Sequence, residues 1–398
     1  MDVPVLEDLD LRKGQRVFVR VDFNVPMSDG VIEDDLRIVS ALPTIEHLLD
    51  RHVTVVLGSH LGRPKGTVDP KSSMAPVAAH LGALLGREVP LAPHAVGPVV
   101  EELVAGSEPG SVVMLENLRW NAGEEANDPA FAANLAMGYD AYVNDAFGAC
   151  HRAHASIVGP PQVLPSAAGR LLAREVEVLG RLLEGAEPPF VAVLGGAKVS
   201  GKIGLIRNLL DRVDRIVIGG GMAFTFFKAA GLEIGTSLLD ESYLDMCREL
   251  MERSGKGPAK RIFLPVDCVV AKEIAAGAEH RTVSTGDIPE DWAGVDIGEK
   301  TVTVFRDELV KAGTIFWNGP MGVFEIPEFA EGTKRVARAI VEATSEGATS
   351  VVGGGDSVAA LGQLHLKDRV THVSTGGGAS LEMLEGKVLP GVAALSDA

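Results

Sequence analysis

Short apolar segments that end in glycine or in polar residues recur along this chain and alternate with segments of helical spacing. Two of the apolar segments are 16-RVFVRVDF and 189-PFVAVLGG, and 329-FAEGTKRVARAIVEAT carries helical spacing. Near-continuous apolar runs are typical of strands that are covered on both faces, as in parallel sheets. Parallel strands need a crossover connection, usually a helix, so the alternation predicts an α/β fold of right-handed βαβ units.

The length of 398 residues exceeds one ordinary hydrophobic core, so we expect two domains. The segment 166–185 repeats leucine and valine at helical spacing and stops before the pair Pro188-Pro189, which favours a helix between the domains. An ordinary surface helix is the alternative. The prediction is two Rossmann-like domains with parallel sheets covered by helices, joined by a hinge helix: domain 1–168, linking helix 169–185 and domain 186–388. The remaining strands are expected at 53-VTVVLGSH, 111-SVVMLENL, 140-DAYVNDAF, 215-RIVIGGG, 261-RIFLPVDCVV, 313-GTIFWNG and 349-TSVVGGG.

The composition narrows the class of protein. The formal net charge of −17 argues against nucleic acid or an anionic membrane as a partner. The three cysteines cannot form a disulfide framework and are typical of reduced thiols in a cytosolic protein. The acidic start MDVPVLEDLDL has no apolar signal region, and no apolar run is long enough to span a membrane. We therefore expect a cytoplasmic protein that acts on small molecules.

Arginines follow the expected strands of the first half. Arg63 follows 53-VTVVLGSH, Arg119 follows 111-SVVMLENL, and Arg152 follows 140-DAYVNDAF, while Arg37 lies at the start of an expected helix. The carboxyl ends of parallel strands share one edge of a sheet, where ligands bind. Guanidinium groups bind phosphate and carboxylate in bidentate fashion, so these residues predict an anion site. A solubilising or ion-pairing role is the alternative for each one alone.

Glycine clusters follow the expected strands of the second half, at 195–196, 219–221, 353–355 and 376–378. Glycine between a strand and a helix lets backbone N–H groups approach a phosphate. Lys198 and Lys202 lie four residues apart, and we expect both on one face at the start of a helix. Asp356 could bind the Mg²⁺ of a nucleotide or could instead cap a helix, and Glu325 could accept hydrogen bonds from a ribose. Together these features predict a nucleotide site.

Three sequence patterns that would indicate other kinds of site are incomplete or missing in this chain. Residues 196–202 match G-x-x-x-x-G-K, but Ile203 stands where a P-loop needs Ser or Thr for Mg²⁺. Neither half has G-x-G-x-x-G after its first strand, which argues against a nicotinamide-dependent dehydrogenase. Cys150, His151 and His154 lack a second pair of ligands at zinc spacing, so these histidines are interpreted as neighbours of an anion.

The assembled segments resemble the phosphoglycerate kinase family. The segments that carry the resemblance run in the family's order through nearly the whole chain: 20-RVDFNVP, 59-SHLGRP, 116-ENLRW, 142-YVNDAFGACHRAHAS, 194-LGGAKVSGKI, 218-IGGGMAFTF, 317-WNGPMGVFE, 353-GGGDS and 372-HVSTGGGASLE. The resemblance implies reversible phosphoryl transfer from 1,3-bisphosphoglycerate to Mg-ADP, which gives 3-phosphoglycerate and ATP, in a glycolytic monomer that closes at a hinge. It also implies that the tail 389–398 returns to the N-terminal domain.

The resemblance implies roles for individual residues. Substrate-binding residues would be Asp22, Phe23, Asn24, Arg37, His60, Leu61, Gly62, Arg63, Arg119, His151 and Arg152. Nucleotide-binding residues would be Gly196, Lys202, Gly221, Gly294, Asn318, Glu325, Gly354, Gly355, Asp356 and Ser357, with Asp356 also meeting Mg²⁺. Residues at the transferred phosphoryl group would be Arg37, Lys198, Gly376 and Gly377.

The chain departs from the family's usual residues at three places. Gly201 stands where Asp is common, Ala149-Cys150 replaces Thr-Ala, and Glu299 replaces Pro. None of these removes a charged residue assigned to the chemistry. Two other interpretations stay open from the residues alone. A binding protein that clamps an anionic metabolite would also use arginines and a hinge, and a nicotinamide-dependent dehydrogenase would share the α/β architecture.

Overall fold

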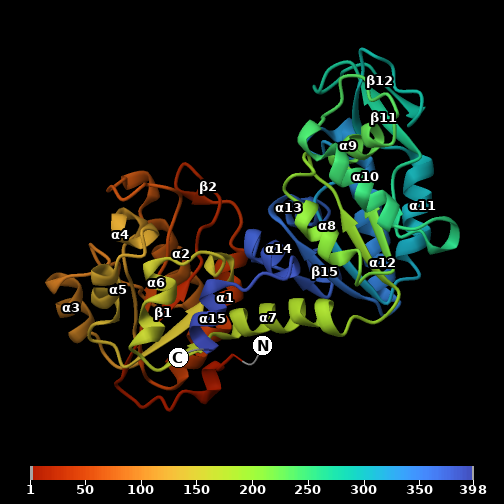
Figure 1. Ribbon diagram of the computed structural model, residues 1–398. Helices are drawn as coiled ribbons and strands as arrows, with labels where there is room; N and C mark the ends of the chain where they lie inside the picture. The colour runs from red at the N-terminus through yellow and green to blue at the C-terminus, as the bar shows by residue number, and fades with distance from the viewer. Residues whose placement is uncertain (1–2, 397–398) are drawn as a thin grey trace. The chain divides into compact units, whose positions relative to one another are not determined.

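The computed structural model describes residues 3–396, which divide into two compact units (Figure 1). One unit comprises residues 3–177 together with 388–396, and the other comprises residues 178–387. The division falls inside helix α7, Arg170–Glu184, so the two halves of the expected linking helix belong to different units. Residues 166–168, the start of the segment whose spacing favoured a helix, form a strand, and the helix begins at Arg170, close to the predicted bound of 169.

The first unit is built on a five-stranded parallel sheet in the order β5-β4-β1-β6-β7. All residues of β4 are buried and β1 is buried from its second residue onward, because helices cover the sheet. The main core packs Val19 and Val55 of the sheet against Ile38 and Leu48 of helix α1. The strands are β1 Arg16–Val21, β4 Thr54–Gly58, β5 Val112–Met114, β6 Ala141–Asp145 and β7 Ser166–Ala168. The helices are α1 Leu36–Asp50, α2 Ala75–Leu85, α3 Pro98–Ala105, α4 Ala122–Glu125, α5 Pro129–Ala136 and α6 Ala155–Val158.

The second unit is built on a six-stranded parallel sheet in the order β10-β9-β8-β14-β15-β16. Its core packs Trp317 of β14 against Phe305 of α11 and Ile340 of α12. The strands are β8 Phe190–Leu194, β9 Arg215–Ile218, β10 Ile262–Phe263, β14 Thr314–Asn318, β15 Thr349–Gly353 and β16 His372–Val373. The helices are α8 Ile203–Leu209, α9 Met222–Ala229, α10 Leu244–Arg253, α11 Glu299–Leu309, α12 Glu331–Ser345, α13 Gly355–Gln363 and α14 Gly378–Leu384.

The α/β class with parallel sheets covered by helices is confirmed, but two small antiparallel sheets accompany the parallel ones. One is the hairpin of β2 Met27–Ser28 and β3 Val31–Ile32. The other, in the order β12-β11-β13, contains β11 Asp267–Ala271, β12 His280–Ser284 and β13 Ala293–Ile297. The prediction of a single strand over 261-RIFLPVDCVV is therefore wrong. Pro265 has no amide hydrogen for a ladder, and the chain leaves the main sheet there.

The C-terminal helix α15, Pro390–Ser396, belongs to the first unit and lies beside α6 (Figure 1). The amide of Gly391 donates to the carbonyl of Cys150 at 2.9 Å. A Cβ atom at Gly391 would lie 2.7 Å from Ile157 Cγ2, so only glycine permits this close approach. Among residues 3–396, no helix combines the length and hydrophobicity needed to cross a bilayer.

Candidate active site

The first group of candidate residues lies at the carboxyl ends of β1 and β4, which are neighbours in the sheet. Arg37, in the first turn of α1, places Nη1 3.0 Å from Asp22 Oδ2 and donates to the carbonyl of Asn24 at 3.1 Å. Asn24 Oδ1 in turn accepts a hydrogen bond from the amide of Gly62 at 2.9 Å. Arg37 and the two segments after the strands are thus joined directly.

Arg119 extends this group from the segment after β5. Its Nη1 donates to the carbonyl of Gly62 at 2.9 Å, and its Nε lies 3.2 Å from Glu125 Oε1. His60 lies beside Asp22, with Nδ1 3.8 Å from Oδ1. We call this set the polar rim: Asp22, Asn24, Arg37, His60, Gly62 and Arg119. The structure thus brings together residues that are far apart in the sequence, as the shared edge of a parallel sheet requires.

Burial and charge set the ionisation of the polar rim. Burial pushes the pKa of Asp22 upward, but the positive charges of Arg37 and Arg20 help to outweigh it and leave this pKa below its ordinary value. Burial, with Arg20, Arg119 and Arg37 nearby, holds the pKa of His60 well below its ordinary value, although Asp22 opposes the shift. Burial and neighbouring arginines lower the pKa of His154 to about 4. Both histidines are therefore neutral near pH 7.

The other predicted substrate residues are placed differently. Phe23 and Leu61 have buried side chains, and their backbones are fixed: Phe23 N–H donates to Ser59 Oγ at 2.9 Å, and the carbonyl of Leu61 accepts from Asn117 Nδ2 at 2.7 Å. Arg63 and Arg152 have exposed side chains, and His151 is half-buried.

The sequence analysis gave no role to Arg20, Glu124 or Ser156, yet all three are completely buried beside the polar rim. Ser156 Oγ accepts from Arg20 Nε at 2.8 Å and lies 2.6 Å from Glu124 Oε1, to which its hydroxyl donates. One signal was available, because Arg20 is a charged residue inside the apolar run 16-RVFVRVDF. A charge at such a position is rarely buried without partners.

Asp145, the last residue of β6, is a buried carboxyl group near the start of α7. Its Oδ1 accepts from the amide of Leu172 at 3.1 Å. Burial raises the pKa of Asp145 to about 7, although hydrogen bonds from Thr44 and from the amides of Leu172 and Leu171 oppose the shift. The folded protein thus prefers the protonated carboxyl group, while the unfolded chain ionises near its ordinary pKa.

We expect Asp145→Asn to flatten the pH dependence of stability. A raised folded pKa contributes stability that is present below about pH 4 and is lost as the pH rises through about 7. Asparagine resembles the protonated carboxyl group, so the variant should gain on the parent between pH 5 and 8, by up to about 4 kcal/mol. Urea-unfolding midpoints at several pH values measure this gain. Parallel pH profiles of variant and parent would contradict the raised pKa.

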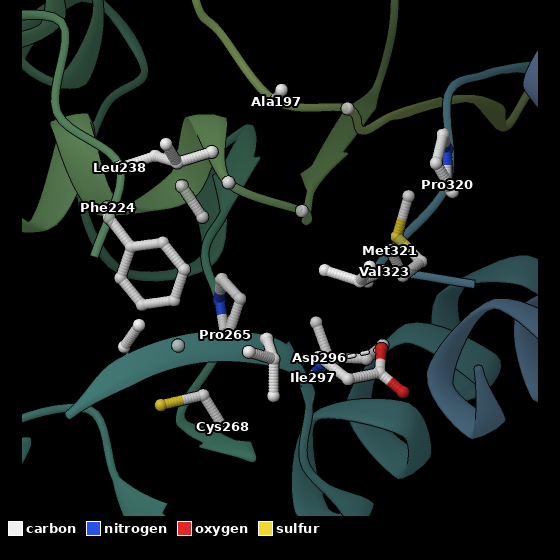
Figure 2. A pocket seen from close by; sticks show the side chains of 18 of the residues that line it. Ala197, Phe224, Leu238, Pro265, Cys268, Asp296, Ile297, Pro320, Met321 and Val323 are labelled. Carbon is white, nitrogen blue, oxygen red and sulfur yellow. Dashed lines mark hydrogen bonds between the residues drawn. The ribbon is translucent and has the colours of Figure 1, made fainter. Parts of the chain in front are cut away.

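The second group of candidate residues surrounds a cavity of about 280 Å³ in the second unit (Figure 2). Five of the predicted nucleotide residues line it: Gly196, Gly221, Gly294, Glu325 and Asp356. Gly294 lies on β13, where a Cβ atom would lie 1.8 Å from the ring of Phe224. Only glycine allows this aromatic ring to approach the backbone at that wall of the cavity.

Most of the wall is apolar, and the sequence analysis did not identify it. Figure 2 shows Phe224, Leu238, Pro320, Met321 and Val323 around the opening, together with Ala197 and Cys268. These residues come from separate segments of the chain, so no local pattern marks them as neighbours. Ligand cavities are commonly apolar with a few polar groups that fix orientation, and this one fits that description.

Lys198 and Lys202 are not placed as predicted. Helix α8 begins at Ile203, so Lys202 is its N-cap and Lys198 lies in the preceding loop with an exposed side chain. Burial lowers the pKa of Lys202, while the carboxylate of Asp356 opposes the shift. Lys202 Nζ would lie 3.4 Å from a Cβ atom at Gly196, which places this ammonium group beside the glycine turn after β8.

The turn after β15 corrects a second expectation. Helix α13 has Gly354 as its N-cap, so Asp356 lies within the first turn and the interpretation of Asp356 as a cap is wrong. Ser357 is buried, and its Oγ accepts from the amide of Gly319 at 2.6 Å. Asn318 Nδ2 donates to the carbonyl of Gly353 at 2.8 Å, which ties β14 to the turn.

The glycines before α14 form another turn. Gly376 N–H donates to Ser374 Oγ at 3.2 Å, and Gly377 adopts a φ of +51° just before the helix. Neither residue lines the cavity. The same holds for Lys202, Asn318, Gly354, Gly355 and Ser357, of which Gly355 and Ser357 adjoin the lining residue Asp356 in the chain.

Comparison with known proteins decides the family. The family described as phosphoglycerate kinase matches residues 6–387. The chain belongs to the phosphoglycerate kinase family. It is 56% identical over 397 residues to the phosphoglycerate kinase of Rubrobacter xylanophilus, with 100% of this chain and 99% of the relative covered. It is 53% identical over 398 residues to that of Thermosipho africanus, with 100% and 98% covered.

Solved structures agree with this assignment. The phosphoglycerate kinase of Coxiella burnetii superposes with a TM-score of 0.87 at 41% identity and covers 100% of this chain and 99% of its own. That of Pyrococcus horikoshii gives a TM-score of 0.86 at 33% identity, with 98% of both chains covered. The match to the phosphoglycerate kinase family spans the polar rim and the cavity alike. It decides against the binding-protein and dehydrogenase interpretations.

Proposed function

We propose that this chain catalyses reversible phosphoryl transfer from 1,3-bisphosphoglycerate to Mg-ADP, which gives 3-phosphoglycerate and ATP in glycolysis. The observation that carries the proposal is the full-length match to the phosphoglycerate kinase family. A coupled assay with 3-phosphoglycerate and Mg-ATP, which follows ADP release, tests it. Absence of ADP release above the rate without 3-phosphoglycerate would contradict the proposal.

The polar rim of the first unit is proposed to bind the phosphoglycerate, with Arg63, Arg152 and His151 adding exposed or half-buried donors. When ATP is consumed, the attacking group is a carboxylate that is already ionised at neutral pH. No general base is required, and the lowered pKa of His60 makes its imidazole a weak base. The residues contribute by positioning the substrate and by neutralising charge.

The cavity of the second unit is proposed to bind the nucleotide. Its apolar wall suits the faces of a base (Figure 2), and Glu325, which also lines the cavity, suits a ribose hydroxyl. Lys202, Asn318, Gly354, Gly355 and Ser357 are proposed to hold or position the phosphates. Lys198, Gly376 and Gly377 are proposed to meet the transferred phosphoryl group together with Arg37.

Asp356 is the proposed protein ligand of Mg²⁺. Its carboxylate is exposed and lines the cavity. Within residues 3–396, no cluster of three or more His, Cys, Asp or Glu forms a closed metal site. The single carboxylate of Asp356 fits Mg²⁺, which prefers oxygen ligands and is usually held by one or two carboxylates together with substrate phosphates and water. When bound, the ion supplies positive charge to the phosphate oxygens.

We expect Asp356→Asn to weaken binding of Mg-ADP by about tenfold to a hundredfold, because one charge-assisted contact is lost. Binding of metal-free ADP should change little, and so should folding, because Asp356 is exposed and is not the N-cap of α13. Calorimetry with and without Mg²⁺ measures both affinities. Glu252→Gln, at an exposed position of α10, is the matched control. Equal losses for ADP with and without the metal would contradict a role in metal binding.

Domain closure about α7 is proposed as the conformational step. Transfer requires reacting atoms about 3–3.5 Å apart, while the two ligands are assigned to separate units. We expect 3-phosphoglycerate and nucleotide together to lower the radius of gyration more than either ligand alone. Deletion of 389–398, which removes the whole of α15, should impair catalysis more than binding of either ligand. Small-angle scattering of the four ligation states measures closure, and identical radii together with full activity of the truncated chain would contradict it.

The same proposal includes a cytoplasmic monomer. Sedimentation velocity of the purified protein measures the oligomeric state, and a single species at the mass of 41.8 kDa is expected.

A further inference from the structure

Arg20 is a completely buried charge in the middle of the first unit. It lies on β1, the strand that pairs with β4 and β6 in the five-stranded sheet, and its side chain has an exposed fraction of 0%. Its guanidinium group donates through Nε to Ser156 Oγ at 2.8 Å and through Nη1 to the carbonyl of Val21. Its Nη2 lies 3.2 Å from Nδ1 of His60 and 3.8 Å from Glu124 Oε1. All three nitrogen atoms of the guanidinium group therefore have a partner, and the partners of Nη2 include the imidazole of His60.

The contact with Arg20 fixes the hydrogen-bonding role of His60. A guanidinium group has only donors, so His60 Nδ1 must accept. Asp22 Oδ1 is the nearby carboxylate that would favour a proton on Nδ1, but it lies 3.8 Å away, beyond hydrogen-bonding distance. A neutral imidazole that accepts at Nδ1 carries its proton at Nε2.

We propose that Arg20 is a positioning residue that holds His60 as the neutral Nε2–H tautomer, so that His60 donates a hydrogen bond to an anionic oxygen of the phosphoglycerate. This inference rests on the proposed function for the identity of the anion. Arg20 itself is fully buried and acts through His60. The proposal gives Arg20, a buried cation outside the polar rim, a role in substrate binding.

The surroundings of Arg20 keep it in place. Glu124 is also fully buried and accepts from the amide of Ser156 at 2.9 Å and from its hydroxyl at 2.6 Å. A buried charge needs both an opposite charge and hydrogen-bond partners, and Glu124, Ser156 and Asp22 supply them. These contacts hold Arg20 beside His60.

The charged groups around His60 also disfavour a second ring proton. Arg20, Arg119 and Arg37 repel an imidazolium, and Asp22 is the group that opposes them. Protonation of Nδ1 would additionally place two donors, that nitrogen and Arg20 Nη2, against one another at 3.2 Å. The geometry alone thus excludes the Nδ1–H form while Arg20 stays in place.

Nitrogen NMR of the intact wild-type protein tests the tautomer without any activity measurement. Long-range ¹H–¹⁵N correlations of the imidazole rings distinguish the two neutral tautomers and the imidazolium. The chain has 10 histidines, and the spectrum of His60→Gln identifies the signals of His60 by their loss. We expect a single neutral Nε2–H tautomer between pH 6 and 8. An Nδ1–H tautomer, an imidazolium or a mixture in that range would overturn the proposal.

A double-mutant cycle then tests whether Arg20 acts through His60. Arg20→Lys retains the positive charge but loses the planar guanidinium group with its separate donors. We expect this variant to raise KM for 3-phosphoglycerate by about tenfold while KM for Mg-ATP stays the same. In the His60→Gln background the same substitution should have little further effect. Multiplicative effects of the two substitutions would overturn the coupling. If the chain lacks the kinase activity, the assay fails for the wild type also, whereas the NMR result still decides the tautomer.

Discussion

Replacement of Arg37 by alanine is expected to lower kcat by about 10²–10³, because an oriented cationic contact to a transition-state charge is worth about 3–4 kcal/mol. The structure adds a second reason. Arg37 is the group whose charge does most to lower the pKa of the buried Asp22, and it fixes the carbonyl of Asn24. Its loss therefore disturbs the polar rim as well as the assigned contact with the phosphoryl group. Steady-state kinetics with saturating substrates measures the change in kcat.

The affinity for Mg-ADP should remain near that of the wild type in Arg37→Ala, because Arg37 belongs to the first unit and the cavity to the second. Arg51→Ala is the matched control, since Arg51 is the exposed C-cap of the same helix α1. This control should retain full turnover. Equal losses of nucleotide affinity and turnover in Arg37→Ala, measured by calorimetry and kinetics, would contradict the division of labour between the units.

Replacement of Lys198 by alanine is expected to lower kcat by a similar factor, about 10²–10³, with little effect on stability. Lys198 is exposed in the loop before α8, so its removal leaves no cavity and no unpaired buried charge. If Lys198 contacts the phosphoryl group only during transfer, kcat and kcat/KM should fall together while the affinity for ADP is retained.

The control for Lys198 is Lys311→Ala, because Lys311 is also exposed and lies in the second unit, after α11. The two variants should unfold at similar temperatures, which calorimetry can verify. Weaker binding of ADP in Lys198→Ala without a loss of kcat would show that Lys198 holds the ground-state nucleotide. In that case its assignment to the transferred group would be wrong.

Much of the fold could be predicted because an apolar run in the sequence marks each buried strand of the main sheets. The runs 315–317 and 190–194 are apolar throughout, and both lie in strands that are buried along their whole length. The family was likewise readable from the sequence, since its motifs are local segments in a fixed order. The prediction failed where local signals are weak. Strand β12 has the sequence HRTVS and is mostly exposed, so no apolar run marks it.

The candidate site, too, could be predicted only in part. The residue types were visible in the sequence, as were their places after strands, for example Arg37 at the start of α1 and Asp356 after three glycines. The N-cap of α13 was not visible, because Gly354, Gly355 and Ser357 are all compatible with helix starts. The structure assigned the cap to Gly354 and thereby left Asp356 available for another role.

The sequence by itself determined the α/β class, the family and the chemical kind of the residues after each strand. Tertiary structure decided which of these residues meet. Arg20 and Ser156 are 136 positions apart, and the cavity wall combines Phe224 with Val323. Such neighbours follow from the order of strands in a sheet, which places distant segments side by side. Periodicity and motif spacing describe one segment at a time, so they carry no information about that order.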